Sequence, residues 1–539
     1  MLRAVTSDML DPKTPPDVVI RAEARRPELD PTVGVAVSPM LSGTPRHRLV
    51  AIGDSLTHGF QSGAIFNTAL SYPALIAQEL GWKSFRFPTY GGPGDGLPLN
   101  LEKLARFLEK RFGNTLDWWE FAPGLLAVRE FLDQVEDYWE RGEGSIFPSE
   151  TAPMNHNLAV YGWDLRNTLS YTADLAQDTI AANPPTDNFI NQIVEHANQR
   201  AALRVLNSAR DQRSAFTPLQ AAAALGAEGT LENGTGDGIE TLIVMIGANN
   251  ALGSILTFNV AWSGEGYDDM VRNDRYTVWR PIHFQAEWDQ LVVELKKIRA
   301  RHVIISTVPH VTIAPLARGV GEKIAPGSRY FPYYTFPWFD NGSFNPQKNP
   351  HITEQEARAI DSAIDQYNDF ITASVRQARQ EGRNWYLFEL SGLLDRVAYR
   401  RYLEDPAAQP SWWDAVGGEY PLPSPLQRLN PIPDSRFFQS DQTGRKQGGI
   451  FSLDGIHPTT IGYGVVAQEI IQIMQLAGVK FYTANGAERL GAVQIDFARL
   501  IQQDTLISNP PSTLASSLSV IGWLDRNFNI FGQLLRSSF

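Results

Sequence analysis

Five short apolar segments, separated by longer helical patterns, constrain the fold of this chain most strongly. Each has the length of a buried strand and ends in or is followed by glycine, proline or small polar residues; they are residues 49–52, 155–162, 239–246, 301–308 and 385–390. Helical patterns occupy residues 69–80, 164–180, 283–300, 352–380 and a last stretch ending near 476. This alternation predicts an α/β protein with a five-stranded parallel sheet, right-handed crossovers and helices on both faces.

The chain is longer than one hydrophobic core usually requires, so additions to the α/β core are expected. Its 539 residues imply either two domains or one domain with large insertions. The patterns predict an N-terminal arm (1–46), a central α/β domain (47–478) with insertions at about 82–154, 181–238 and 312–350, and a C-terminal extension (479–539) that packs on the core. Within the extension, residues 514–535 form an amphipathic pattern interrupted by charged and polar residues.

Charge and composition exclude several classes of function. The formal net charge is −12 and there is no long basic run, so nucleic acid is not an expected partner. The chain has no cysteine, which removes disulfides, thiolate catalysis and cysteine zinc sites. No signal-peptide pattern and no stretch of about 18 apolar residues is present. A soluble, cytoplasmic protein without a membrane span is therefore expected; the oligomeric state is not indicated.

Three residues at predicted strand or helix ends have the chemistry of a nucleophilic triad. Ser55 directly follows the first strand pattern, while Asp454 and His457 precede the last helix. A serine hydroxyl needs a neighbouring base to remove its proton, and histidine suits that role near neutral pH. Asp454, three residues before the histidine, can orient the imidazole and stabilise its cation. The structural alternative for Ser55 alone is an ordinary capped turn.

Acyl transfer also requires hydrogen-bond donors for the developing oxyanion. The candidates are the backbone N–H groups of Ser55 and Gly162 and the side-chain amide of Asn249, each at a strand end. The glycine-rich loop at residues 91–96 competes with Gly162 for its role, but it does not follow a strand pattern. Gly162 is therefore preferred.

Four sequence blocks carry a family resemblance. They are Gly-Asp-Ser-Leu at 53–56, the strand-end Asn-Leu-Ala-Val-Tyr-Gly at 157–162, Gly-Ala-Asn at 247–249 and Asp-Gly-Ile-His-Pro at 454–458. In this order they resemble the SGNH (GDSL-type) serine esterase and lipase family. The resemblance implies a flavodoxin-like three-layer α/β/α fold and hydrolysis of esters without metal or cofactor. It also implies Ser55, Gly162, Asn249 and His457 as the family's four named positions, with Asp454 completing the triad.

Asn250 departs from the family pattern, since the third block usually continues with aspartate. An amide there keeps hydrogen bonds but not charge, which would tune activity rather than abolish it. His58, Tyr333 and Trp338 are candidates for contact with a small-molecule, lipid or carbohydrate ester. Acyl lipids and acetylated sugars are both compatible with this pattern. A non-catalytic binding protein that has kept the fold is the alternative from another class.

Overall fold

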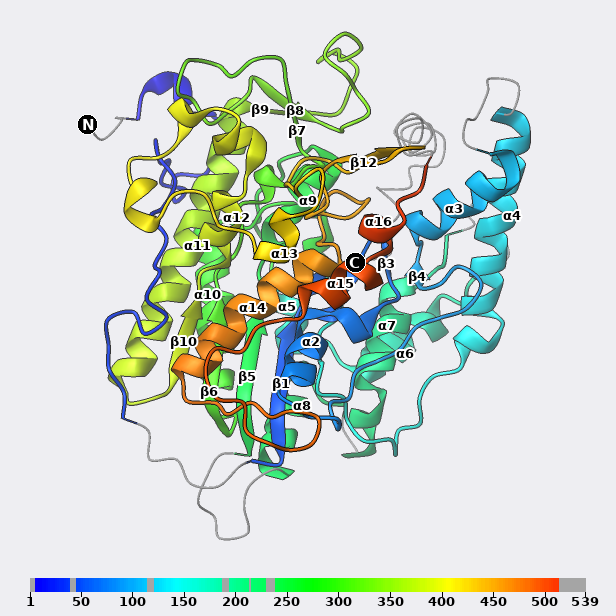
Figure 1. The fold of residues 1–539 in the computed structure, drawn as a ribbon, viewed down its shortest axis with the longest axis vertical. Helices are drawn as coiled ribbons and strands as arrows, with labels where there is room; N and C mark the ends of the chain where they lie inside the picture. The colour runs from blue at the N-terminus through cyan, green and yellow to red at the C-terminus, as the bar shows by residue number, and fades with distance from the viewer. Residues whose placement is uncertain are drawn as a thin grey trace.

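The computed structural model describes residues 5–38, 45–113, 121–186, 193–212, 215–228 and 238–512. At its centre lies a four-stranded parallel sheet in the order β1-β5-β6-β10 (Figure 1). Its strands are β1 (His47–Gly53), β5 (Ile239–Met245), β6 (Ala300–Ser306) and β10 (Trp385–Phe388). All three pairings are parallel. Each strand coincides with a predicted apolar segment, so the prediction of an α/β fold with a parallel sheet is confirmed.

Of the five predicted strands, the second, residues 155–162, does not form a regular strand. It runs along the outer edge of β1, where Ala51 donates to the His156 carbonyl (2.9 Å) and Leu158 donates to the Ala51 carbonyl (2.8 Å). The Asn157 side chain forms competing hydrogen bonds, to the Thr57 carbonyl (2.8 Å) and from the Ala159 N–H (3.2 Å). Side-chain bonds of this kind replace regular ladder pairing. Within the described residues the central sheet therefore has four strands and an irregular fifth segment.

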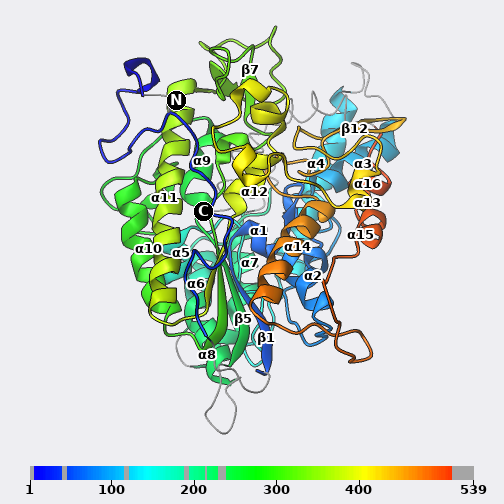
Figure 2. The same cartoon turned by 60° about the vertical axis from the view of Figure 1, so that its left-hand side comes forward.

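Alternate residues of each strand face opposite layers, which explains why the strands are apolar on both sides. In β1, Val50 and Ile52 belong to one hydrophobic cluster, whereas Leu49 and Ala51 belong to another. The strands β5, β6 and β10 divide in the same way. The sheet is thus the middle layer between two helical layers, as Figure 2 shows.

Helices α2 (Tyr72–Glu79) and α14 (Thr460–Leu476) pack on one face of the sheet. The opposite face is covered by α8 (Pro218–Glu228), α10 (Pro281–Leu295) and α11 (Glu354–Gln380). In Figure 2 the sheet lies between α10 and α11 on the left and α2 and α14 on the right. Short helices follow β1, β5 and β10: α1 (Ser55–His58), α9 (Asn249–Thr257) and α12 (Leu390–Arg396).

The single helix predicted at residues 164–180 is wrong, because the chain forms two. They are α5 (Leu165–Ser170) and α6 (Ala173–Ala182). Asp164 begins the first with a capping box, and the Thr172 side chain begins the second by accepting from the Leu175 N–H (3.2 Å). A hydroxyl that caps a new helix favours a break in a continuous helical pattern.

The segment expected as the second insertion, 181–238, contains helices that cover the sheet. It includes α7 (Ala197–Leu206), which packs on α6, and α8, which packs on β1. Ala221, Ala222 and Leu225 of α8 are fully buried. This segment therefore belongs to the connection between the irregular segment beside β1 and strand β5.

The other additions surround the core. The first insertion carries α3 (Leu101–Phe112) and α4 (Phe121–Glu140), which lie together at the right in Figure 1. The smaller sheets are β2 (Phe60–Gln61), β3 (Ala64–Ile65) and β4 (Leu97–Pro98); β7 (Arg318–Val320), β8 (Tyr333–Thr335) and β9 (Ile352–Thr353); and the hairpin of β11 (Gln439–Asp441) and β12 (Gly444–Gln447). The remaining α-helices are α13 (Ser424–Gln427), α15 (Phe497–Gln503) and α16 (Thr505–Ser508).

Both ends of the described chain lie over this core. The arm follows α11, where Val19 donates to Gln366 and Arg21 to Ser362 (Figures 1 and 2). Phe497 and Leu500 of α15 pack against the layer formed by α2 and α14. The amphipathic pattern at 514–535 lies outside the described residues.

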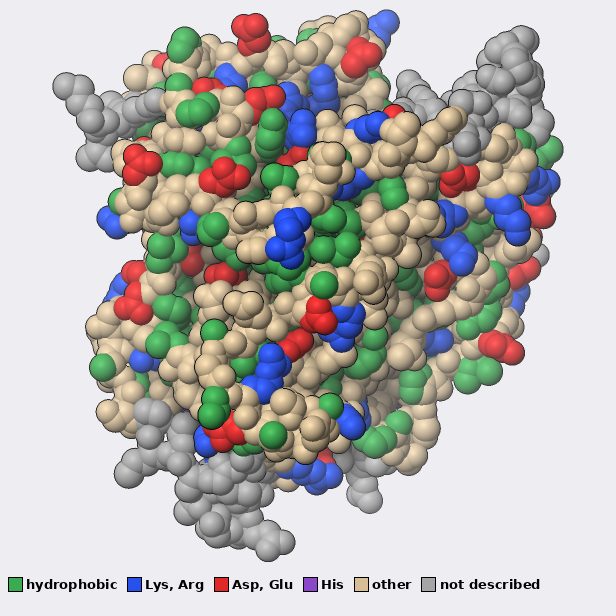
Figure 3. All heavy atoms as spheres, in the orientation of Figure 1, with side chains coloured by type: hydrophobic (Ala, Val, Ile, Leu, Met, Phe, Trp, Pro, Cys, Tyr) green, Lys and Arg blue, Asp and Glu red, His purple; other side chains and the backbone are tan. Residues whose placement is uncertain are grey.

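Charged side chains of both signs are interspersed on the face seen in Figure 3. Among the described residues, no helix combines the length and apolar character needed to cross a membrane.

Candidate active site

Ser55 lies at the carboxyl end of β1, at the start of α1. The Asp54 side chain caps this helix by accepting from the Leu56 N–H (3.1 Å), and Gly59 ends it in the left-handed region (φ 94°). Burial raises the pKa of Asp54 to about 7. The segment beside β1 and strand β5 flank this strand on opposite sides. Ser55 thus lies where the strand order reverses, the usual position of ligand sites in α/β sheets.

Ser55, His457 and Asp454 form a continuous hydrogen-bonded chain. His457 Nε2 lies 2.8 Å from Ser55 Oγ, and His457 Nδ1 lies 3.0 Å from Asp454 Oδ2. All three residues are more than nine-tenths buried. The distances are those of a nucleophile, a base and a carboxylate that orients the base.

The turn around Asp454 holds its carboxylate in the ionised state. Its oxygens accept from the N–H groups of His457 (2.8 Å), Ile456 (2.9 Å) and Gly63 (3.0 Å). Burial acts to raise the pKa of Asp454, but the facing His457 and these hydrogen bonds outweigh it and lower the pKa below its usual value. A carboxylate that favours its ionised form therefore faces Nδ1 of the histidine.

The three predicted oxyanion donors lie on neighbouring segments. Val160 donates to the Gly53 carbonyl (3.3 Å), which aligns the residues after Val160 with those after Gly53. Asn249 Nδ2 donates to the Trp163 carbonyl (2.7 Å), which places this amide beside Gly162. Within the described residues, neither the Ser55 nor the Gly162 N–H group donates a hydrogen bond to the protein. Both backbone donors therefore remain available to a ligand.

The competing glycine-rich loop, residues 91–96, packs elsewhere. A Cβ added to Gly92 or Gly94 would collide with Tyr138 or Val135 of α4. The loop's glycines thus permit close packing on this helix. The structure therefore favours Gly162 over this loop as the backbone donor, in agreement with the sequence pattern.

Asn250 is fully buried behind Asn249. Its Oδ1 accepts from the Leu165 N–H (3.4 Å), and its carbonyl accepts from the Trp279 N–H (2.7 Å). It therefore connects α9 to the start of α5 and to the segment before α10, which is a bracing position.

The expected substrate contact at His58 is not supported. His58 is fully buried, and its ring nitrogens lie 2.9 Å from the Tyr90 hydroxyl and 3.2 Å from the Tyr161 N–H. Burial lowers the pKa of His58 to about 3, so the imidazole is neutral. His58 therefore has a structural role, because its hydrogen bonds with Tyr90 and Tyr161 hold the end of α1 in place.

Tyr333 and Trp338, the other proposed contacts, do not line the cavity beside Ser55. Tyr333 packs on Phe344 (ring centroids 5.6 Å apart), and Trp338 stacks on Phe336 (4.4 Å). These aromatic side chains pack on others of the same loop, which the sequence pattern does not indicate. Sequence reasoning missed the residues that form the cavity, because they come from many separate segments.

The cavity beside the triad is almost entirely apolar and measures about 80 Å³. Ser55 and His457 lie on its wall with Leu252, Leu394 and Val466. It is smaller than an engineered cavity of roughly 150 Å³ that accommodates benzene. The site can therefore accommodate a small apolar group next to the serine hydroxyl.

His310 also lines this cavity and belongs to a buried charge cluster that sequence reasoning missed. Its Nε2 lies 3.0 Å from Asp365 and its Nδ1 lies 3.1 Å from Asp395. Burial acts to lower the pKa of His310, but Asp395 and Asp365 outweigh it and raise the pKa to about 10. Asp365 and Asp395 lie far from His310 in the sequence, so no local sequence pattern indicates the cluster.

Protonated His310 should stabilise the fold more at neutral pH than at alkaline pH. With an unfolded pKa near 6.5, its stabilisation is complete below that value and is lost as pH rises towards about 10. Urea unfolding from pH 7.5 to 10 should therefore show a steeper fall in unfolding free energy for wild type than for His310→Gln. The control is His302→Gln, because burial lowers the pKa of His302 to about 4 and it is neutral in this window. Parallel pH slopes for wild type and His310→Gln would contradict a charged His310.

No protein-family profile matches the chain, and no curated protein sequence matches it.

Proposed function

We propose that this protein is an SGNH-type serine hydrolase that cleaves short-chain carboxylic esters through an acyl-enzyme on Ser55. The observation that carries the proposal is the hydrogen-bonded chain from Ser55 through His457 to Asp454 at the carboxyl edge of the sheet. The strand order supports it as well. With the irregular segment counted, the order is that of a flavodoxin-like sheet, in which the second element flanks the first on the side opposite the third.

In the proposed reaction, Ser55 Oγ attacks the ester carbonyl carbon while His457 Nε2 takes the hydroxyl proton. The carbonyl oxygen becomes an oxyanion that accepts hydrogen bonds from the Ser55 and Gly162 N–H groups and from Asn249. His457 then protonates the leaving alcohol, and the acyl group remains on Ser55. Water, deprotonated by His457, attacks this acyl-enzyme, and the proton returns to Ser55 as the carboxylic acid leaves. Asp454 stabilises the imidazolium in both halves.

The size and apolar character of the cavity support a short acyl group. A pocket of about 80 Å³ with Leu252 and Leu394 on its wall favours acetyl to butanoyl groups over long chains. Acetylated sugars share the acyl group of the shortest of these esters, so they belong in the same test.

A series of p-nitrophenyl esters with acetylated sugars tests this function. We expect kcat/KM to be highest for acetyl to butanoyl esters and to fall for octanoyl and longer chains. Leu394→Trp should fill the cavity and shift the preference towards acetyl. It should lower kcat/KM for butanoyl about tenfold or more, because one methylene in a hydrophobic pocket is worth ~1–3 kcal/mol. Leu175→Trp, at a half-buried position on α6 outside the cavity, is the control. Absence of hydrolysis across the series, or a preference for long chains, would contradict the proposal.

A further inference from the structure

A second cavity adjoins the apolar one. It measures about 300 Å³, at the lower end of the range for small-molecule sites. Ile313 and Ala314 line both cavities. Phe437, on the wall of the second cavity, contacts the position of Gly455, the residue after Asp454. The second cavity therefore lies against the turn that carries the triad's carboxylate and histidine.

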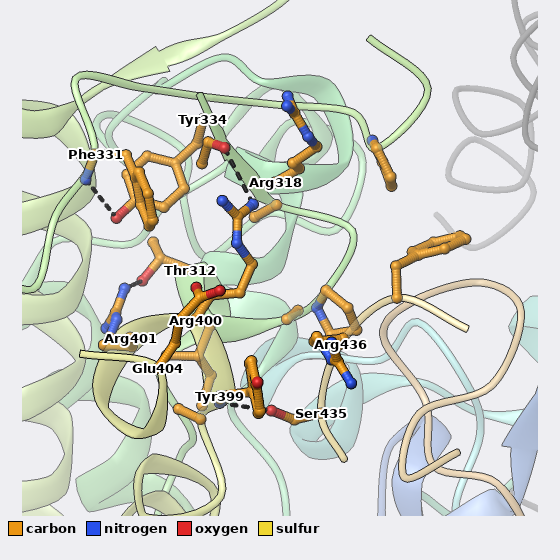
Figure 4. A pocket seen from close by; sticks show the side chains of 18 of the residues that line it. Thr312, Arg318, Phe331, Tyr334, Tyr399, Arg400, Arg401, Glu404, Ser435 and Arg436 are labelled. Atoms are coloured by element: carbon orange, nitrogen blue, oxygen red, sulfur yellow. Dashed lines mark hydrogen bonds between the residues drawn. The ribbon is translucent and has the colours of Figure 1, made fainter. Parts of the chain in front are cut away.

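The second cavity is strongly cationic. Its lining includes five arginines and one acidic residue: Arg318, Arg329, Arg400, Arg401, Arg436 and Glu404 (Figure 4). Two of these arginines form ion pairs, Arg401 with Asp361 (2.8 Å) and Arg436 with Asp434 (2.7 Å). Among the described residues, no carboxylate oxygen lies within 4.0 Å of the guanidinium nitrogens of the other three. Three positive charges thus have no paired carboxylate.

Arg400 occupies the central position in this cavity. Its guanidinium lies 4.7 Å from the centroid of the Phe331 ring and donates to the Gly319 carbonyl (3.1 Å). Figure 4 shows the side chain extending across the cavity towards the side of Phe331 and Tyr334. Burial lowers the pKa of Arg400, so its cation is only partly compensated. The aromatic face and the carbonyl fix the orientation while leaving donor N–H groups for a ligand.

Arg329 and Arg318 add to this positive charge. Arg329 is only 6% exposed, and within the described part of the chain its Nε and Nη2 have no hydrogen-bond partner. Arg318 donates to the Phe339 carbonyl (2.7 Å), and its pKa is lowered by burial and by neighbouring Arg400. Buried cations and buried donors without partners are costly. An anion in this cavity would offset the cost of burying the Arg400 and Arg318 cations.

We propose that the second cavity binds a phosphate group, with Arg400 as its principal contact and Arg329 and Arg318 supplying further positive charge. Guanidinium groups match the oxygens of phosphate and form strong charge-assisted hydrogen bonds with them. Three arginines without a paired carboxylate suit a phosphate monoester, which carries up to two negative charges, better than they suit a single carboxylate.

The position of the cavity assigns this phosphate to the substrate. Because Ile313 and Ala314 line both cavities next to the triad, the proposal places the acyl group of an ester in the first cavity and a phosphate on its alcohol in the second. This step rests on the proposed esterase function. Free phosphate acting as an effector uses the same chemistry, and the experiment separates the two sources.

The kinetic arm compares monobutanoylglycerol with its 3-phosphate. We expect wild type to prefer the phosphorylated ester, and Arg400→Gln to reduce the ratio of the two kcat/KM values about tenfold or more, mainly through KM. Arg400→Lys, which keeps the charge but loses the planar fork, should give a smaller reduction. Arg272→Gln removes an exposed arginine that pairs with Asp269 and should leave the ratio at its wild-type value. Equal loss on both esters would overturn the proposal.

The binding arm does not depend on hydrolysis. Calorimetric titration of inorganic phosphate should give saturable binding to wild type, to Ser55→Ala and to Arg272→Gln, with strongly weakened binding to Arg400→Gln. Circular dichroism checks that each variant is folded.

If phosphate binds without any preference for the phosphorylated ester, the substrate assignment is overturned and the cavity is an effector site. If neither ester is cleaved but phosphate still binds through Arg400, the esterase proposal and its phosphorylated substrate fail while the phosphate site stands. No phosphate binding to wild type and no preference between the esters would overturn the site itself.

Discussion

Ser55→Ala should lose ester hydrolysis, with a fall in kcat on the order of 10⁶ if the residue acts as the nucleophile of a triad. The expected loss is this large because no acyl-enzyme forms without the hydroxyl, while His457 and Asp454 cannot substitute for it. The fold should persist, since the change removes one oxygen from a residue whose backbone conformation is set by the Asp54 cap and Gly59. Steady-state kinetics on p-nitrophenyl acetate, with a thermal melt, is the measurement.

Ser254→Ala provides a matched control for this variant. Ser254 is also fully buried, and its hydroxyl donates to the Ala251 carbonyl within α9. It lies outside the apolar cavity, so its loss should leave kcat within a few-fold of wild type. Hydrolysis retained by a folded Ser55→Ala protein would place the nucleophile elsewhere.

Asn249→Ala should lower kcat on the order of 10²–10³, or roughly 3–4 kcal/mol, with little change in KM. The proposed hydrogen bond forms with the oxyanion and is much weaker with a neutral carbonyl, so its loss raises the barrier without weakening the substrate complex. The Asn249 amide already donates one bond to the Trp163 carbonyl (2.7 Å), which orients it and leaves its second N–H for the substrate. Kinetics on one short-chain ester measures both constants.

The neighbouring variant Asn250→Ala separates oxyanion stabilisation from bracing. Asn250 is fully buried and holds the Leu165 N–H (3.4 Å), so its loss should affect stability more and kcat less than the loss of Asn249. A larger fall in kcat for Asn250→Ala, or an Asn249→Ala effect mainly on KM, would contradict the oxyanion assignment.

The central strands and the triad could be predicted because their signals are local. β1 and β5 each contain a short apolar run, at residues 49–52 and 242–245, and the residues after them carry the proposed chemistry. Parallel strands bring their carboxyl ends to one edge of a sheet. This places Ser55 and Asn249 together. His457 instead precedes the last helix, and its sequence block and its suitability as a base predicted that it lies beside Ser55, 402 positions away.

Other features depend on tertiary contacts that leave no local pattern. The irregular segment beside β1 reflects hydrogen bonds of the Asn157 side chain. The helix break at Thr172 reflects a cap that competes with a continuous helical pattern. His58 resembles a cleft residue in sequence, but it is buried against Tyr90.

The cationic cavity shows the same limit most clearly. Arg318, Arg329, Arg400 and Arg436 come from separate segments and meet only in the folded chain. The overall charge of −12 gives no indication of a local positive site, because net charge averages over the whole surface.

Reaction with a fluorophosphonate, followed by intact-protein mass spectrometry, tests the central claim most directly. The serine oxygen displaces fluoride from phosphorus, so an activated serine gains one phosphonyl group whatever the natural ester is. We expect one added group on wild type, located on Ser55 by peptide mapping, and no labelling of folded Ser55→Ala at the same reagent concentration. An unlabelled wild-type protein, or a label on another residue, would contradict it.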